Sequence, residues 1–518
     1  MKYIRAIKTL ILVLIASSLV SCNSYSKNDT TTHNKRALVF DAEKFEIQEV
    51  TVGNVSFKIR AYENIVYVEK PVDTVYQIMN IYIPAEYFKQ KEKGGYNAET
   101  APIFFENSVG GYMESTPKTA KGNDRPRMIG GGPSGIKTDD NSKYQDNAIP
   151  EMPQPKKREN IVARALSEGC VVACPGTRGR RTTTASGKYT GKAPAAIVDL
   201  KAAIRYLKFN DDKMPGNANK IVSDGTSAGG ALSALLGSSG NVEDYELYLK
   251  ELGAANATDD IFAVMAYCPI TILEQADAAY EWQFSGVYTY SKRGDQGTLS
   301  ETQIKISNDL EKQFPDYLNS LRLKTSDGNV LKLDEAGNGN FKEYIKSFIV
   351  SSAQTALNKG ITLSEYNWIS IKNNKVTDID YDAYIVYLGR MKTPPSFDAL
   401  DLSTRENQLF GNATTDKQHF TDYAVANSTA VAAKVDDKAV ALMNPMTFIG
   451  KPYSDIPNYW RIRHGTKDPH TALAISAILA TKLSNNGLDV DYAIPWDEPH
   501  GGYYDLDELF AWIKIVTK

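Results

Sequence analysis

The stretch that most constrains the fold is residues 220–240, KIVSDGTSAGGALSALLGSSG. It begins with a short apolar segment, passes through GTSAG at 225–229, and continues into small and apolar residues. A serine between two glycines at this spacing is typical of a sharp turn from a strand into a helix. The flanking positions must be small, because the backbone turns too tightly to admit side chains. We therefore predict a strand at 220–223, a turn at Ser227 and a helix from Gly230.

This turn has a chemical consequence. It would expose the Ser227 hydroxyl at a helix N-terminus and leave the Ala228 N–H free to bind an oxyanion. The pentapeptide alone could arise by chance, but chance does not also supply the strand before it and the helix after it. We therefore predict that Ser227 is a catalytic nucleophile and that Ala228 is an oxyanion donor.

The composition sets broad limits. A chain of 518 residues can bury a large core, either as one big domain or as two to three smaller ones. Its 59 Lys and Arg residues face 62 Asp and Glu residues, for a net charge of −3. This balance provides no basic field, so we expect no nucleic-acid partner.

The N-terminus is predicted to be a targeting segment. Basic residues precede an apolar run at 10–20, which ends in Leu-Val-Ser-Cys at Cys22. This ending resembles the lipobox of bacterial lipoproteins, whose cysteine is diacylated and becomes the first residue of the mature protein. We predict a signal peptide at 1–22, a flexible tether at 23–37 and a lipid anchor on Cys22 in the bacterial cell envelope, on the periplasmic or outer-membrane face. An ordinary secretory signal or a membrane anchor is the alternative, although the run is short for a span.

Strands and helices alternate in two parts of the chain. The first part holds predicted strands and helices at 45–52, 55–61, 65–68, 76–83, 101–106, 160–168, 170–174, 193–209 and 261–267. The second part holds a strand at 459–463, a helix at 471–485, a strand at 490–494 and a last helix, for which Asp505 and Glu508 have capping-box spacing. The fold class is α/β: a mainly parallel central sheet with helices on both faces.

Residues 272–427 interrupt this alternation. Helices are predicted at 301–321, 340–358 and 381–388, with turns between them. We therefore predict a catalytic domain formed by 38–271 and 428–518, with 272–427 inserted as a large lid domain.

A nucleophilic serine needs a base, and the chain has five histidines, His33, His419, His464, His470 and His500. His500 follows the last strand and Asp468 follows the strand before it, so both would project from the same edge of the sheet. The order Ser227, Asp468, His500 is that of the α/β-hydrolases. We predict this triad, although Asp468 could instead cap a helix and His500 could be a turn residue.

Two glycines complete the predicted catalytic site. Gly110 and Gly111 follow the strand at 101–106, where a second oxyanion donor lies in such folds, and either of them could supply it. The cysteines at 170, 174 and 268 are expected to be buried thiols. No histidine, cysteine or carboxylate cluster has metal-ligand spacing, so we expect neither a metal nor another cofactor.

The chain resembles the bacterial subtype B tannases, α/β-hydrolases with a large lid that split galloyl esters, in four segments, 107–112, 225–230, 461–468 and 496–505. The resemblance covers most of the mature chain. Fungal tannases and their feruloyl esterase relatives carry cysteines directly before the catalytic serine and histidine. Thr226 and Pro499 stand at those positions here, which excludes the fungal branch.

The resemblance also implies substrate-binding residues. In the bacterial family, a lysine and a glutamate of the lid and an aspartate two residues after the catalytic one bind the gallate hydroxyls. Lys392 and Glu406 match the first two, whereas His470 replaces the third. The expected function is a serine carboxylesterase for galloyl or related phenolic esters. The alternatives are another esterase or a serine peptidase on the same fold, or a non-catalytic ligand-binding surface lipoprotein. The oligomeric state is left open.

Overall fold

A computed structural model describes residues 38–122, 159–292 and 295–518. The predicted signal peptide, the tether and Cys22 lie outside these described residues, as does His33.

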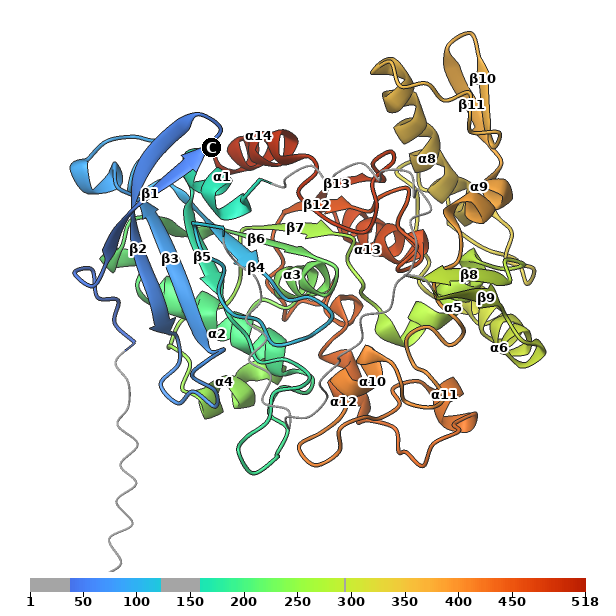
Figure 1. Cartoon of the computed structure of the whole chain (residues 1–518), viewed down its shortest axis with the longest axis horizontal. Coiled ribbons are helices and arrows are strands. Elements are labelled where there is room, and N and C mark those ends of the chain that lie inside the picture. The colour runs from blue at the N-terminus through green and yellow to red at the C-terminus, as the bar shows by residue number, and fades with distance from the viewer. Residues whose placement is uncertain (1–37, 123–158, 293–294) are drawn as a thin grey trace, which may run out of the picture. The chain divides into compact units, whose positions relative to one another are not determined.

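A nine-stranded sheet forms the centre of the described chain, in the order β1-β2-β3-β5-β4-β6-β7-β12-β13 (Figure 1). Its members are β1 (Glu46–Val52), β2 (Val55–Val66), β3 (Ile78–Pro84), β4 (Pro102–Asn107), β5 (Val171–Pro175), β6 (Asn217–Thr226), β7 (Ala263–Tyr267), β12 (Tyr459–Arg463) and β13 (Asp489–Ala493). The strands from β5 to β13 pair in parallel, and β1, β2 and β3 add an antiparallel edge.

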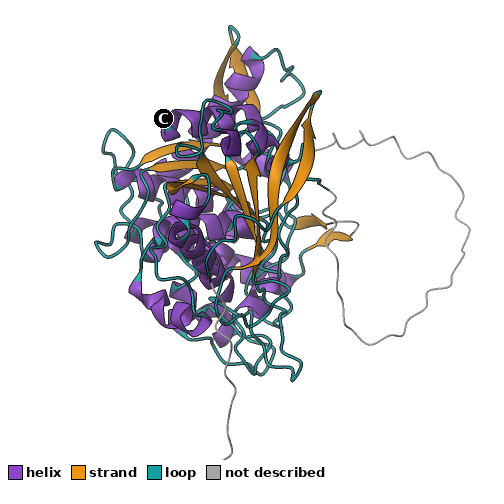
Figure 2. Ribbon diagram, turned by 90° about the vertical axis from the view of Figure 1, so that its left-hand side faces the viewer, coloured by secondary structure: helices purple, strands orange, loops and turns teal. Residues whose placement is uncertain are grey.

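Helices cover both faces of the sheet because alternate residues of its strands point to opposite sides. On β4, Ile103 and Phe105 pack into one apolar core with α2 (Ala195–Phe209), α3 (Ala228–Ser238) and α13 (Leu473–Asn485). Phe104 packs on the opposite side with α1 (Ile161–Ser167) and α14 (Leu506–Thr517). The predicted mainly parallel sheet with helices on both faces is confirmed, and Figure 2 shows its strands fanned out beside the helices.

The order of the strands fixes where a site can form. From β4 the chain moves to β5 on one side, and β6 then pairs with the other side of β4. Ligands of open parallel sheets bind at the carboxyl ends of the strands beside such a reversal. The loops that follow β4 and β6 hold Gly110 and Ser227, and both lie at this reversal.

The segment between β7 and β12 adds no strand to the nine-stranded sheet within the described residues. It contains two small hairpins, β8 (Thr289–Lys292) with β9 (Asp295–Thr298) and β10 (Ile369–Lys372) with β11 (Lys375–Ile379). Its helices are α5 (Leu273–Gln283), α6 (Glu301–Glu311), α7 (Phe314–Ser320), α8 (Asn340–Asn358), α9 (Tyr381–Leu388), α10 (Arg405–Leu409), α11 (Asp422–Ala426) and α12 (Asp437–Ala441); α4 (Glu246–Leu252) precedes β7. The lid boundaries at 272 and 427 stay a prediction.

Two local predictions are wrong. The single helix predicted at 301–321 is divided into α6 and α7, and Pro315 stands in the first turn of α7. Proline fits a first helical turn but not a helix interior. The capping box at Asp505 is not made: its carboxylate instead accepts hydrogen bonds from the Tyr267 hydroxyl and the Arg461 guanidinium.

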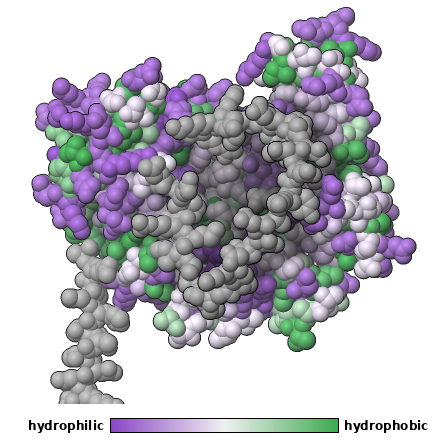
Figure 3. Space-filling view, viewed as in Figure 1, coloured by the Kyte–Doolittle hydropathy of each residue, from purple (hydrophilic) through white to green (hydrophobic). Residues whose placement is uncertain are grey.

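The surface is mixed in character. Hydrophilic residues predominate on the face shown in Figure 3, with smaller groups of hydrophobic residues between them. Among the helices that the structure describes, none has both the length and the apolar character that a membrane span needs.

Candidate active site

The turn around Ser227 has the predicted form. Strand β6 ends at Thr226 and α3 begins at Ala228, with Ser227 between them at φ 62° and ψ −121°. The Ser227 N–H donates to the Tyr267 carbonyl at 2.9 Å, and the Ser227 carbonyl accepts from the Ala231 N–H at 2.9 Å. Positive φ is unfavourable for serine, so bonds from β7 and α3 hold the turn in place.

Contacts explain the two glycines of this turn. A Cβ on Gly225 would lie 2.4 Å from the Gly229 carbonyl oxygen. A Cβ on Gly229 would lie 2.9 Å from the carbonyl oxygens of Asn107 and Val109. Any side chain at either position would therefore push the helix off the strand or off the loop that follows β4.

The loop after β4 lies against the start of α3. The Asn107 side-chain amide donates to the Gly229 carbonyl at 3.0 Å. A Cβ on Gly110 would meet no heavy atom within 4 Å, so this glycine faces open space. Gly111 has φ +55°, and its carbonyl accepts from Arg180 Nε at 2.9 Å. The loop is thus fixed beside the start of α3, which is where an oxyanion hole requires it. The donor roles of Ala228, Gly110 and Gly111 stay predictions.

Asp468 and His500 meet although 32 residues separate them in the sequence. Asp468 Oδ2 lies 2.7 Å from His500 Nδ1, and the Asp468 carboxylate is fully buried. Burial acts to raise the pKa of Asp468, but contacts with His464 and His500 outweigh it and hold the pKa well below its usual range. The carboxylate is therefore ionised at neutral pH and can orient the imidazole.

The histidine loop lies against the serine turn. A Cβ on Gly502 would lie 2.4 Å from Thr226 Oγ1, so the backbone at Gly502 lies directly against the side chain that precedes the nucleophile. The Cys268 thiol, directly after β7, donates to the Gly501 carbonyl at 3.3 Å. These contacts hold His500 next to the loop that carries Ser227.

His464 is a partner of Asp468 that the sequence analysis missed. Its Nε2 lies 3.3 Å from Asp468 Oδ2, and its Nδ1 lies 2.8 Å from Ser476 Oγ. The side chain is fully buried. The only signal was a histidine four residues before the aspartate at a strand end, and this spacing alone does not identify a contact.

His470 lies directly on the candidate base. Its ring stacks on the His500 ring with centroids 4.0 Å apart and planes 11° apart. The His470 N–H donates to Asp468 Oδ1 at 2.9 Å. His470 stands where the resemblance implies an aspartate. Its ring therefore restricts the plane of the His500 imidazole.

Lys392 is joined to the loop that holds Asp468. The Tyr280 hydroxyl donates to the Pro469 carbonyl at 3.1 Å and accepts from the Lys392 N–H at 3.1 Å. Lys392 Nζ lies 3.6 Å from the centre of the Phe397 ring. Burial lowers the pKa of Lys392 to about 8, while the charge of Glu406 opposes this shift.

Buried polar contacts hold the start of α10, the helix that carries Glu406. The Asn407 side-chain amide, next in the chain, donates to Asp398 Oδ1 at 2.6 Å. His419 Nδ1 lies 2.7 Å from the same oxygen, so this histidine supports the loop. A Cβ on Gly111 would lie 3.0 Å from the Arg405 guanidinium, which places α10 beside the loop after β4.

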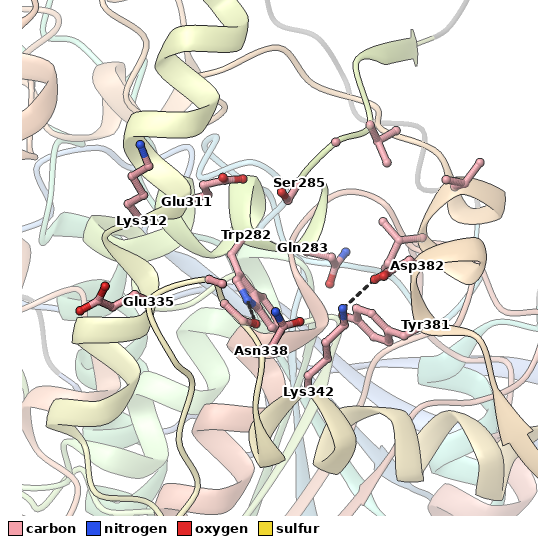
Figure 4. A pocket seen from close by; sticks show the side chains of 16 residues that line it. Trp282, Gln283, Ser285, Glu311, Lys312, Glu335, Asn338, Lys342, Tyr381 and Asp382 are labelled. Carbon is pink, nitrogen blue, oxygen red and sulfur yellow. Dashed lines mark hydrogen bonds and ion pairs between the residues drawn. The ribbon is translucent and has the colours of Figure 1, made fainter.

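Two cavities lie in the segment between β7 and β12, and neither lining includes a predicted triad residue. One, of about 370 Å³, borders α5, α11 and α12. The other, of about 580 Å³, is bordered by Trp282 and Tyr381, with Lys342 paired to Asp382 at 2.7 Å (Figure 4).

Cys268, Asp468 and His500 offer metal-ligand atoms within 4.8 Å of one another. Spacing in the sequence could not reveal this grouping, because the three residues come from separate loops. The hydrogen bonds described above account for it, and the expected absence of a metal stays a prediction. Cys170, Cys174 and Cys268 are buried and unbridged, as predicted.

The sheet and the serine turn are those of the α/β-hydrolase fold, and the comparisons define the class of protein as a serine-type esterase. The BD-FAE family model matches residues 153–304. Esterase LipC of Mycobacterium tuberculosis is 39% identical over 71 residues, a stretch that spans 14% of this chain and 17% of that esterase.

Solved structures extend the comparison over almost the whole chain. The tannase of Fusobacterium nucleatum is 47% identical with a TM-score of 0.83, over 93% of this chain and 100% of that one. The tannin acyl hydrolase of Lactobacillus plantarum is 42% identical with a TM-score of 0.83, over 93% and 99%. At the same 42% identity, tannin acyl hydrolases were solved with ethyl gallate and with 3,4-dihydroxybenzoate. The chain belongs to the bacterial tannase family, and the protein is a carboxylic ester hydrolase.

Proposed function

We propose that the protein hydrolyses galloyl or related phenolic esters through Ser227, His500 and Asp468 and an acyl-enzyme intermediate. The observation that carries the proposal is the 2.7 Å bond between His500 and a buried, ionised Asp468, in a loop that lies against the serine turn. An orienting carboxylate, a base and a serine at a helix N-terminus are the parts that acyl transfer needs.

In the proposed mechanism, His500 Nε2 takes the Ser227 proton while Ser227 Oγ attacks the ester carbonyl. Asp468 fixes the tautomer of His500 and stabilises the imidazolium that forms. The N–H groups of Ala228 and of Gly110 or Gly111 bind the negative oxygen of the tetrahedral intermediate. The imidazolium then protonates the leaving alcohol, and a water activated by the same imidazole releases the acid.

Recognition of the ring follows from the cost of burying hydroxyl groups. Each hydroxyl left without a partner costs about 1–3 kcal/mol. We propose that Lys392 donates to one hydroxyl of the ring and that Glu406 accepts from its neighbours. The tannin acyl hydrolases solved with ethyl gallate and with 3,4-dihydroxybenzoate support a phenolic substrate. His470 carries no fixed negative charge, so the proposed preference for three ring hydroxyls over two is modest.

Lys392→Ala and Glu406→Ala should each lower kcat/KM for methyl gallate by about tenfold to a hundredfold, which corresponds to one unpaired buried hydroxyl. The value for methyl benzoate should change by less than about threefold. Steady-state kinetics with gallate, 3,4-dihydroxybenzoate and benzoate esters would measure this, with the exposed Lys359→Ala as a control. If both variants lowered all three esters equally, these residues would not read the ring hydroxyls. A site with two carboxylates would strictly prefer gallate over 3,4-dihydroxybenzoate esters. Such a strict preference in this protein would overturn the role proposed for His470.

The proposal for location is a lipid anchor on Cys22 in the bacterial cell envelope. Cys22→Ser should release the protein from the membrane fraction or leave its signal peptide uncleaved, because both processing steps require the thiol. Membrane fractionation with mass determination of the N-terminus would measure this. Normal cleavage with unchanged membrane association would mean that another feature holds the protein there.

A further inference from the structure

One tyrosine of the histidine loop contacts two strands of the central sheet. Tyr503 lies three residues after His500, and its hydroxyl oxygen is 2.8 Å from Asp224 Oδ2 and 3.2 Å from Glu106 Oε1. Asp224 lies on β6, three residues before the nucleophile. Glu106 lies on β4, four residues before the first glycine of the oxyanion loop. One side chain therefore contacts the strands that carry the two other catalytic loops.

The two carboxyl groups are neighbours in a dry environment. Glu106 and Asp224 are Cα partners across the parallel pair β4–β6, and both are fully buried. Glu106 also contacts Lys118 Nζ and accepts from Ser108 Oγ at 2.7 Å. Among the described residues Asp224 forms no ion pair, and its Oδ1 has no hydrogen-bond partner. Burial and the charge of Glu106 raise the pKa of Asp224 more strongly than the charge of Lys118 lowers it.

A proton count assigns the states of the cluster. The single proton of the Tyr503 hydroxyl can bond one carboxylate, so the second short contact requires a proton on a carboxyl group. Asp224 forms no direct ion pair among the described residues, and burial raises its pKa to about 8, so it is the acid of the pair. A proton on Asp224 lets its O–H donate to the Tyr503 oxygen while the Tyr503 O–H donates to Glu106 Oε1.

We propose that Tyr503 is a positioning residue: through Asp224 and Glu106 it holds the histidine loop in register with the serine turn and the oxyanion loop. This inference rests on the proposed function of those loops. Tyr503 itself has φ +66°, which is unfavourable for a tyrosine and persists only where contacts fix it. A displacement of His500 by about 1 Å costs up to about a hundredfold in rate.

Because Asp224 can lose its proton, the position of the histidine loop relative to the serine turn and the oxyanion loop depends on pH. Its carboxyl group is faced by titratable and charged groups from β4, β7 and the loops beside them, namely Glu106, Lys118, Tyr267, Tyr503 and Asp505. Burial, and then the charge of Glu106, raise the pKa of Asp224 to about 8. Above that pH two adjacent carboxylates repel each other, and the hydroxyl proton of Tyr503 can bridge only one of them.

The sign of the effect on stability follows from the same pKa. The unfolded aspartate ionises near pH 4, whereas the folded one keeps its proton up to about pH 8. The stabilisation is therefore fully present below about pH 4 and is lost as the pH rises toward 8. An amide at this position donates like the neutral acid and does not titrate, so Asp224→Asn removes this dependence.

Tyr503→Phe keeps the ring and removes both hydrogen bonds. We expect kcat for methyl gallate to fall about tenfold to a hundredfold with KM changed by less than about threefold, because the loss concerns alignment. The matched control is Tyr504→Phe, since the Tyr504 hydroxyl is buried and has no hydrogen-bond partner among the described residues. Wild-type kcat in Tyr503→Phe, or an equal loss in Tyr504→Phe, would overturn the proposal.

Asp224→Asn and Asp224→Ala separate positioning from simple packing. The asparagine variant should keep kcat within about threefold of the wild type and lose the decline in kcat above pH 8, whereas the alanine variant should fall with Tyr503→Phe. As the pH rises from 5 to 8, the midpoint of thermal unfolding of the wild type should fall relative to the midpoint of Asp224→Asn. This readout needs no activity, so it also tests the cluster if the esterase proposal fails. Equal losses of kcat in both Asp224 variants would contradict the proposal. So would thermal midpoints of the wild type and of Asp224→Asn that change in parallel with pH.

Discussion

Replacing Ser227 with alanine should lower kcat for methyl gallate by about 10⁵-fold and leave the fold intact. The reason for the loss is that the proposed route has no other nucleophile, and removal of a catalytic serine typically costs several orders of magnitude. The fold should survive because alanine keeps the Cβ of serine, so the strained backbone at φ 62° meets the same contacts. End-point assays of ester hydrolysis would measure the loss of activity. The midpoint of thermal unfolding would show whether the variant keeps its fold.

A suitable control for this variant is Ser233→Ala. Ser233 lies on α3 close to the turn, is fully buried, and its hydroxyl has no hydrogen-bond partner among the described residues. Its loss should leave kcat within about threefold of the wild type. Turnover at the wild-type rate in Ser227→Ala would end the serine-esterase account.

The second large effect is expected for Asp468→Asn, which should lower kcat about 10⁴-fold with little change in folding. An amide that donates its N–H to His500 Nδ1 leaves the imidazole in the wrong tautomer, with its proton on Nε2, where it cannot act as the base. The change also removes the charge that stabilises the imidazolium. Steady-state kinetics at pH 7 would measure the loss, with the exposed Asp489→Asn as a control. A loss of less than tenfold would mean that His500 does not depend on Asp468.

The sequence predicts the parts of the site that short segments define. The serine turn depends on two glycines, a preceding strand and a following helix, and all of these lie within 217–238. Asp468 and His500 follow adjacent predicted strands of one parallel sheet, and the topology of such a sheet places the ends of those strands together. The strand order bears this out, since β12 pairs with both β7 and β13.

Contacts between loops could not be predicted. The stacking of His470 on His500 and the approach of His464 to Asp468 depend on distances of a few ångströms between side chains whose backbones the sequence does not position. The cluster at Tyr503 requires the register of β4 against β6, which pairs Glu106 with Asp224. The false capping box at Asp505 has the same origin: Arg461 and Tyr267, distant in sequence, bind the carboxylate that the local pattern assigns to the helix.

The most direct test of the proposed nucleophile is to label the protein with a fluorophosphonate probe and map the modified peptide by mass spectrometry. We expect one adduct, on Ser227, whose formation methyl gallate slows by competing for the same site. An adduct on another residue, or labelling that methyl gallate does not slow, would contradict the proposed nucleophile or substrate. No adduct at all, in a folded protein, would contradict the esterase mechanism and favour a non-catalytic ligand-binding protein.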